Sequence, residues 1–332
     1  MRGKCNAQKR GAVRERKANE MNLKRIDAAI KVYAEHLDEA DLARLAFFRK
    51  LWGIIDETES DLARHALADD DAIVSYTVPT KRELSRAVKT GTPVLDIAPV
   101  AIDAQAFAAT MEGIAACMVE NGSYAKDLQE SLLSRKWDRL VAASDISQAG
   151  TDPNGYVSAF CDLLGDDGLD EQAAYLGALV CSLALRAFLE KPAELISAAL
   201  KDVAQESQYF PYCPVCGGAA GVARVGVTEH SDGRGKELWC PQCGAAWEFE
   251  RVRCARCGTQ NQAHLHYFNL EGDDAHRIAT CDECGGFVRT VYQDSALAPF
   301  AFEVEDVVMA KLDLVALQHM QQTQQKQQKQ QS

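Results

Sequence analysis

The chain has 332 residues, 25% of them charged, and a formal net charge of −12 at pH 7. This length is sufficient for two or three domains with a sizeable core, and the composition is that of an ordinary soluble protein. The acidic balance argues against nucleic acid as the main partner, because DNA- and RNA-binding domains present an excess of Lys and Arg to the phosphates.

The two ends of the chain differ from the rest. Residues 1–31 hold ten Lys and Arg against three Asp and Glu. Residues 2–20 lack the apolar stretch of a secretory signal, so we interpret residues 1–21 as a basic mobile arm. The tail at residues 321–332 is rich in Gln and of low complexity, and we expect it to be disordered.

Apolar residues recur at helical spacing between these ends, which predicts an all-α domain over residues 22–207. The segment 172–189 is apolar almost all round, but it is too short and too interrupted for a membrane span, so we expect it to be the central helix. A last helix at residues 296–320 is expected to pack on the helical domain. The other expected helices are two within 23–55 with a break near 38–41, then 58–67, 81–88, 98–120, 128–143, 153–164 and 192–205.

The segment between Cys213 and Cys284 contains four Cys-x-x-Cys pairs. Twenty-three residues separate the first pair from the second, and twenty-three separate the third from the fourth, so that each cysteine of the first half recurs 41 positions later. The chain therefore carries a tandem repeat of one four-cysteine unit. The pairs are Cys213/Cys216, Cys240/Cys243, Cys254/Cys257 and Cys281/Cys284.

This spacing suits a metal ion held by four thiolates. Two residues between cysteines let one tight turn present both sulfurs to the same ion, at about 2.3 Å for zinc. Glycine follows the second cysteine of every pair and permits the left-handed conformation that closes such a turn. We expect β-hairpins between the turns, and thus two rubredoxin-like (zinc-ribbon) units at residues 208–252 and 253–295.

Three other interpretations of the eight cysteines fit the sequence less well. Disulfides suit a secreted domain, a thioredoxin-like pair needs one motif near a βαβ pattern, and iron–sulfur clusters use tighter, less regular spacings. Cys240/Cys243 could instead join Cys254/Cys257, although the repeat symmetry argues against it. Histidines at positions 230, 264, 266 and 276 are weaker candidates, because eight cysteines already complete two tetrahedral sites.

The complete pattern resembles the formate dehydrogenase accessory protein family, FdhE. The resemblance is carried by QYFPYCPVCGG at 208–218, LWCPQCGAAW at 238–247, RVRCARCG at 251–258, HLHYFNL at 264–270 and CDECGGFVRTVYQD at 281–294. It is looser over residues 80–200, where the segment Pro93–Ile97 fits, and weak for residues 1–50 and the tail.

The resemblance implies a non-enzymatic, cytoplasmic factor that matures formate dehydrogenase. It implies contact with the catalytic subunit, a molybdenum or tungsten pterin enzyme, before export, and neither nucleic-acid binding nor stable membrane insertion. It also implies two metal ions per chain, with iron favoured and zinc possible. One site takes Cys213, Cys216, Cys240 and Cys243, and the other takes Cys254, Cys257, Cys281 and Cys284. The alternative function is a rubredoxin-like iron redox carrier or oxidoreductase.

Overall fold

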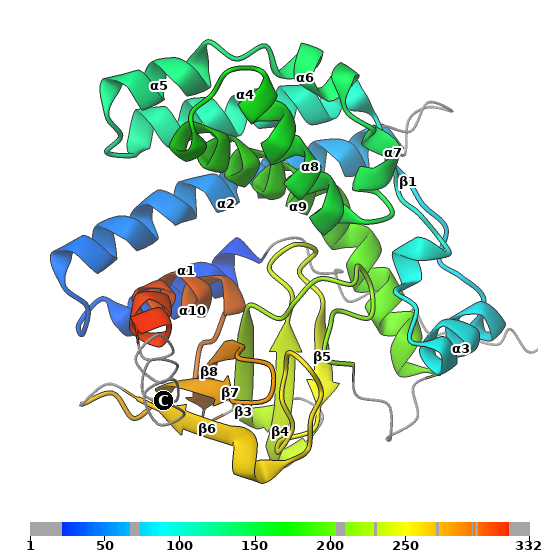
Figure 1. Ribbon diagram of the computed structural model, residues 1–332, viewed down its shortest axis with the longest axis vertical. Coiled ribbons are helices and arrows are strands. Elements are labelled where there is room, and N and C mark those ends of the chain that lie inside the picture. Colours follow the sequence, from blue (N-terminus) through cyan, green and yellow to red (C-terminus); the bar gives the residue numbers. More distant parts are fainter. Residues whose placement is uncertain are drawn as a thin grey trace, which may run out of the picture.

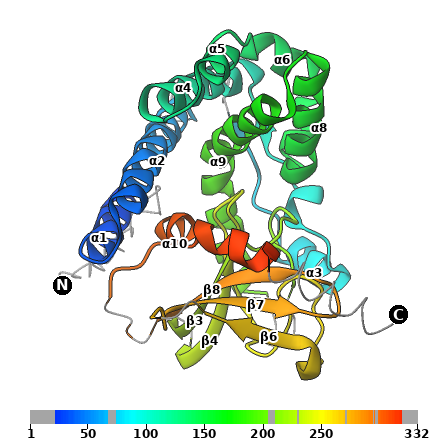
Figure 2. The ribbon, with the colours of Figure 1, turned by 60° about the vertical axis from the view of Figure 1, so that its left-hand side comes forward.

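The computed structural model describes residues 22–66, 74–203, 210–228, 231–269, 272–293, 295 and 298–318. The predicted basic arm, the Gln-rich tail and His230 lie outside these residues. The described chain forms a helical part above a sheet, with a C-terminal helix between them (Figures 1 and 2). It is thus a mixed helix and sheet protein with a helical N-terminal part, as the sequence predicted.

The helical part is built mainly on α9, which contacts α2, α4 and α8, and α2 also contacts α4. Strand β1 (Val74–Ser75), after α2, pairs antiparallel with β2 (Ala101–Ile102), before α4, and so connects two loops of the helical part. The helices are α1 (Leu23–Tyr33), α2 (Glu39–Ala66), α3 (Lys81–Thr90), α4 (Ala104–Asn121), α5 (Lys126–Leu133), α6 (Trp137–Ala143), α7 (Ile146–Ala149), α8 (Pro153–Asp166) and α9 (Glu171–Lys201), with a 3-10 turn η1 (Val94–Asp96) after α3.

Several predicted helix boundaries were wrong. The single helix α9 continues through Pro192 from the segment expected at 172–189 to Lys201 of the segment expected at 192–205. Helix α2 likewise continues to Ala66, through most of the segment expected as a separate helix at 58–67. Proline in a helix interior removes one hydrogen bond and crowds the preceding turn. In α9 the cost is offset by packing, because Phe188, Leu189 and Ile196 around Pro192 are all buried. Conversely, the helix expected at 128–143 divides into α5 and α6.

Helix α9 is the only helix among the described residues that is long and apolar enough to cross a membrane by length and composition. The expectation that this segment is too short to span was therefore wrong. However, 67% of its apolar window is buried inside the protein, as is usual for the central helix of a packed core.

The two cysteine repeats form one sheet of six strands, in the order β5-β4-β3-β8-β7-β6. Each repeat contributes antiparallel strands, and β3 pairs in parallel with β8 to join the two halves. The sequence analysis did not predict this pairing. Gly226 permits it, since a Cβ there would lie 2.0 Å from the carbonyl oxygen of Gln293. The strands are β3 (Val222–Thr228), β4 (Ser231–Trp239), β5 (Ala246–Phe249), β6 (Leu265–Phe268), β7 (His276–Cys281) and β8 (Phe287–Gln293).

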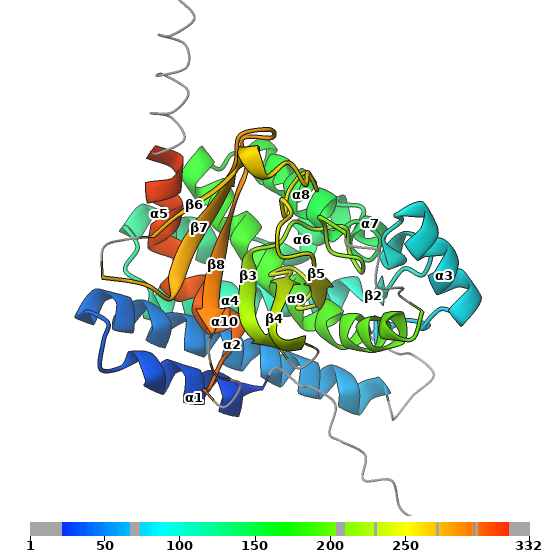
Figure 3. The same ribbon diagram turned by 90° about the horizontal axis from the view of Figure 1, so that it is seen from below.

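Helix α10 (Phe302–Val308) lies between the sheet and helices α1 and α2 (Figures 2 and 3). Its Phe302 ring stacks on Trp239 of β4, with centroids 5.7 Å apart and planes within 5°. After Met309 the chain is helical again over residues 310–318, where Leu312 and Ala316 pack against the same face of the sheet. The C-terminal segment thus joins the helical part to the sheet.

The first ribbon shares its core with the helical part. A single cluster of buried residues includes Phe188 and Leu185 of α9 together with Cys213, Leu238 and Trp247 of the first ribbon. The division into a helical domain at 22–207, ribbons at 208–252 and 253–295 and a C-terminal helix at 296–320 remains a proposal. The shared core indicates that the first ribbon and the helices unfold together.

Candidate metal centres

All four Cys-x-x-Cys turns have the same backbone geometry. In the first, the amide of Gly217 donates to the carbonyl oxygen of Cys213 at 2.8 Å, and the amide of Cys213 donates to Gly218 at 2.7 Å. The other three turns repeat both bonds. The glycine after the second cysteine has a positive φ in each, between 65° and 77°, which explains why glycine stands there.

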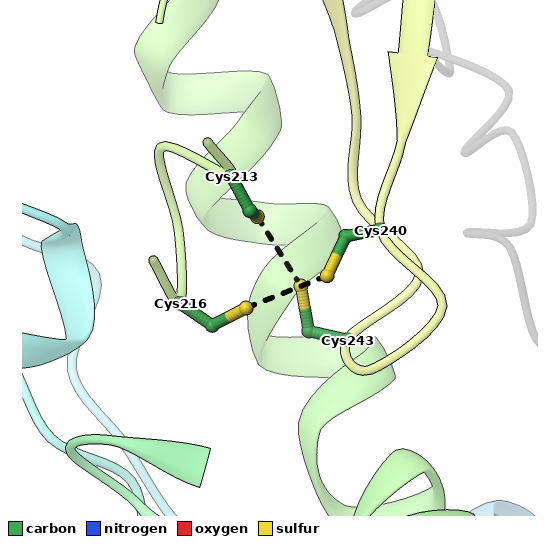
Figure 4. A group of neighbouring side chains, drawn as sticks. All are labelled: Cys213, Cys216, Cys240 and Cys243. Atoms are coloured by element: carbon green, nitrogen blue, oxygen red, sulfur yellow. Dashed lines mark hydrogen bonds between the residues drawn. The ribbon is translucent and has the colours of Figure 1, made fainter. Parts of the chain in front are cut away.

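The eight sulfurs gather into two groups of four, one for each repeat, within 4.8 Å of one another inside a group. The Sγ atoms of Cys213 and Cys243 lie 3.6 Å apart, and those of Cys216 and Cys240 lie 3.5 Å apart (Figure 4). In the second group, the distances are 3.8 Å for Cys254–Cys284 and 3.9 Å for Cys257–Cys281. Four sulfurs at 2.3 Å from a tetrahedral ion are about 3.8 Å apart, so both groups can hold a metal ion.

The first group, which we call site 1, is fully buried, and the segment before α4 binds its first turn. The backbone amides of Val94 and Leu95 donate to the carbonyl oxygens of Pro214 and Val215 at 3.0 and 2.9 Å. The side chain of Pro93 lies against Gly217, whose added Cβ would stand 3.1 Å from it. The resemblance at Pro93–Ile97 therefore has a structural reason, because this segment positions a metal turn.

Helix α9 binds the second turn of site 1. The Arg186 guanidinium donates from Nη1 to the carbonyl oxygen of Pro241 at 2.9 Å and lies 5.2 Å from the centroid of the Trp239 ring. Ser182 and Gln242 exchange two hydrogen bonds, at 2.9 and 3.2 Å. Site 1 is thus fixed by the helical part on both sides.

Arg186 is itself held by two carboxylates, the buried Glu303 and the partly buried Glu190. Its Nε donates to Glu190 at 2.6 Å and its Nη2 to Glu303 of α10 at 2.9 Å. Burial alone lowers the pKa of Arg186, but the charges of Glu190 and Glu303 raise it more, so the group stays charged. Arg186 interrupts the otherwise apolar segment 172–189, and a charge within such a helix indicates a buried partner.

The second group, site 2, is open to solvent. Cys254 and Cys281 are buried, whereas Cys257 and Cys284 are exposed. Backbone amides of Arg256 and Cys257 point at the Cys254 sulfur, at 3.3 and 3.5 Å. Such donors stabilise a thiolate. The two sites therefore have similar ligand geometry, but site 1 is closed to solvent and site 2 is accessible.

The cysteines of site 1 perturb one another's pKa values. Burial raises the pKa of Cys213, whereas hydrogen bonds from Cys213, Cys216 and Cys243 lower the pKa of Cys240. A cation that binds the four cysteines as thiolates displaces their protons, so its affinity rises with pH.

The histidines that the sequence analysis considered weak candidates have other partners. His266 Nε2 lies 2.9 Å from Asp282 Oδ2, and His264 Nδ1 lies 3.5 Å from Glu283 Oε2. Neither belongs to a four-cysteine group.

His276 belongs to a buried polar cluster that the sequence did not reveal. Its Nδ1 lies 2.9 Å from Asp273 Oδ2, and its Nε2 lies 3.1 Å from both Glu305 of α10 and the Tyr33 hydroxyl of α1. The Tyr33 hydroxyl donates to Glu305 at 2.8 Å. The cluster therefore connects the second ribbon to two helices far away in the sequence.

Two four-cysteine groups on rubredoxin-like (zinc-ribbon) units, packed against a helical part, define the class of protein. No family model matches the chain. A curated FdhE homolog from Aquifex aeolicus is 32% identical over 113 residues, which are 33% of this chain and 38% of that protein. The FdhE protein of Escherichia coli is 24% identical over 241 residues, which are 69% of this chain and 68% of that protein.

These relatives confirm the resemblance to FdhE that the cysteine motifs indicated. The chain thus spans about 38% of the length of the first relative and 68% of the second. Among solved structures, the crystal structure of the FdhE protein from Pseudomonas aeruginosa covers 90% of this chain and 91% of its own, at a TM-score of 0.48 and 15% identity.

Proposed function

We propose that this chain is an accessory factor for the maturation of formate dehydrogenase and not itself an enzyme. It acts in the cytoplasm on the catalytic subunit, which carries a molybdenum or tungsten pterin, before that subunit is exported. The similarity to FdhE proteins supports the proposal. The single structural observation that carries it is the pair of four-cysteine groups, one fixed inside the fold and one open at its surface.

The eight cysteines of sites 1 and 2 are proposed to hold two metal ions, with iron favoured over zinc by the resemblance. Four thiolates suit either ion, and an iron ion in such a site supplies one-electron chemistry. The chain's own contribution is rigidity, because the repeated turns and the contacts from 93–97 and α9 fix the loops. A surface fixed before binding loses less conformational entropy when a partner binds.

The proposed client surface comprises the exposed turns of site 2 and the strand β6. Cys257 and Cys284 are exposed there, and the Tyr267 side chain of β6 is 64% exposed. Exposed aromatic residues are enriched among residues that dominate protein interfaces. By contrast, site 1 is covered by the helical part and cannot reach a partner without unfolding.

A deletion strain of the source organism tests the maturation role. The dehydrogenase polypeptide should remain present while formate oxidation is lost, and the wild-type gene should restore it. Tyr267→Ala should fail to restore activity if β6 binds the client, while leaving the metal content at two ions. Tyr175→Ala is the matched control, because Tyr175 of α9 is also exposed, at 71%, but lies on the helical part. Normal formate oxidation in the deletion strain would rule the role out.

The exposure of site 2 favours one alternative, a rubredoxin-like redox carrier. Electron transfer requires the centre to lie near the surface, and two of its four sulfurs do. A reversible one-electron wave from the iron-loaded chain, lost in Cys257→Ser and kept in Cys216→Ser, would favour the carrier. A chain purified with zinc alone, which still restores formate oxidation, would exclude it.

A further inference from the structure

Beside site 2 is a cavity of about 360 Å³ whose wall includes two of its ligands, Cys254 and Cys281, and extends well beyond them. It lies against one face of β6, β7 and β8 and is closed on another side by the segment 251–256 that links the two repeats. Its volume is within the range of small-molecule sites, about 300–1,000 Å³. Five of its lining side chains are cationic: Lys236, Arg251, Arg253, Arg256 and Arg277.

The charge of this cavity is opposite to that of the chain. Residues 209–295 contain eight Lys and Arg and eleven Asp and Glu. Five of the eight cations line the cavity, and none of the acidic residues in the described part of that segment does. The net charge of −12 repels anions from the protein as a whole. Such a concentration of positive charge in an acidic protein needs a local reason.

The strand register places the key side chains on one face of the sheet. Lys236 of β4 is paired with Val225 of β3, which is paired in parallel with Tyr292 of β8. Arg277 of β7 is opposite Thr290, two residues from Tyr292 and on the same face. The parallel seam therefore brings a lysine of the first repeat and an arginine of the second to one cavity.

Among the described residues, no carboxylate forms an ion pair with Lys236 or Arg277, and other groups orient both side chains. Lys236 is only 7% exposed, donates to the carbonyl oxygen of Arg253 at 3.2 Å and lies 5.2 Å from the Phe249 ring centroid. The Arg277 guanidinium stands 4.1 Å from the Tyr292 ring centroid and 5.1 Å from that of Tyr267. Aromatic faces orient a guanidinium and leave its N–H groups available.

Two carboxylates at the edge of the cavity engage lining residues other than Lys236 and Arg277. Glu250 lies 3.7 Å from Arg253, and Asp282 binds His266. Compensation of the site 2 thiolates accounts for part of the positive charge, because Cys254 acts on both Lys236 and Arg256. It does not account for Arg277, which is four residues from Cys281 along β7, or about 13 Å.

We propose that this cavity binds a small organic phosphate, with Lys236 and Arg277 as its main ligands. A phosphate carries close to two negative charges and several acceptor oxygens, which matches a set of converging Arg and Lys donors better than a single carboxylate does. The cavity shares Cys254 and Cys281 with site 2 and Tyr267 with the proposed client surface. Binding is therefore measured on the purified, metal-loaded chain alone, where no client is present.

Isothermal titration of the full, metal-loaded chain with inorganic pyrophosphate and with ADP tests the proposal. Both should bind with one site per chain at physiological salt. Arg277→Gln and Lys236→Met should each weaken binding by at least about tenfold, because each removes a charge-assisted contact. Arg139→Gln is the matched control, since Arg139 lies exposed on α6 in the helical part, and it should bind as the wild type does.

Metal analysis of each variant is the second measurement. Arg277→Gln and Lys236→Met should keep two ions per chain, which separates loss of the phosphate site from loss of site 2. Tighter binding of ADP than of pyrophosphate would show that the organic part also contacts the cavity. Absence of binding by the metal-loaded wild type at millimolar concentration, or equal binding by wild type and Arg277→Gln, would overturn the proposal.

Discussion

The Arg186 guanidinium donates from Nη1 to the carbonyl oxygen of Pro241 at 2.9 Å, and through this bond the central helix touches a turn of site 1. The same guanidinium fills the space beside Gly244, where an added Cβ would stand 2.8 Å from Nη2. A buried charge from the helical part thus contacts the backbone that presents Cys240 and Cys243. The helical part is therefore a structural component of site 1.

Arg186→Met should destabilise the protein by about 3–5 kcal/mol, because it removes the guanidinium that Glu190 and Glu303 share. Glu303 then keeps only the longer contact with Arg25, at 3.8 Å. Urea unfolding of the metal-loaded protein, followed by circular dichroism, measures this loss. Arg135→Met is the control: its ion pair with Asp167 is partly exposed, so its removal should cost about 0–1 kcal/mol. Equal losses from the two variants would contradict the structural role of Arg186.

Cys213→Ser and Cys281→Ser should each leave one metal ion per chain, because each group of four belongs to one repeat. Metal analysis of the purified variants checks the number. Cys213→Ser should also lower the melting temperature of the helices, since site 1 shares its core with them. Loss of both ions from either variant would contradict two independent sites.

A chelator should remove the two ions at different rates. Cys257 and Cys284 are exposed, whereas all four cysteines of site 1 are buried and must be opened by local unfolding. We expect two phases that differ by about tenfold or more in rate when a coloured chelator reports the released ion. Cys213→Ser should keep only the fast phase and Cys281→Ser only the slow one. A single phase in the wild-type protein would contradict the difference in access.

Stability should fall as the pH rises above neutrality because of the His276 cluster. Burial lowers the pKa of His276, but its bonds and charge interactions with Glu305 and Asp273 raise it more, so the net shift is upward from 6.5. A folded pKa above the unfolded one means that the contribution is complete below pH 6.5 and is lost as the pH rises through the folded pKa. Tyr33, whose pKa burial raises, stays a neutral donor throughout.

Urea unfolding of the metal-loaded protein between about pH 6 and pH 9 measures this loss. His276→Gln should remove the fall in stability over that interval. Asp273→Asn should shift the loss to lower pH, because one of the two carboxylates that favour the imidazolium is gone. An identical profile for wild type and His276→Gln would exclude the cluster as its source.

The sequence by itself determined the two four-cysteine groups. A tight Cys-x-x-Cys-Gly turn is a local structure, and its requirements, two sulfurs on one side and a positive φ at the glycine, are visible in five consecutive residues. The repeat of 41 residues then assigned the turns to two groups. The helical character of residues 22–203 was also visible in the sequence, because apolar residues recur there at the spacing of a helix.

The helix boundaries were less well determined. Pro192 predicts a break on local grounds, yet α9 continues through it because the residues around it are buried. Burial of a side chain is a property of the packed chain, and the free energy that it contributes exceeds what one missing backbone bond costs.

Only the tertiary structure decided which residues support the two metal groups and which positively charged side chains lie together at the cavity. The parallel pairing of β3 with β8 places Lys236 and Arg277 beside one cavity, although 40 residues separate them. Tyr33, His276 and Glu305 meet because α1, β7 and α10 pack together. Contacts between residues so far apart depend on how whole elements pack, and no local pattern of residue types records that.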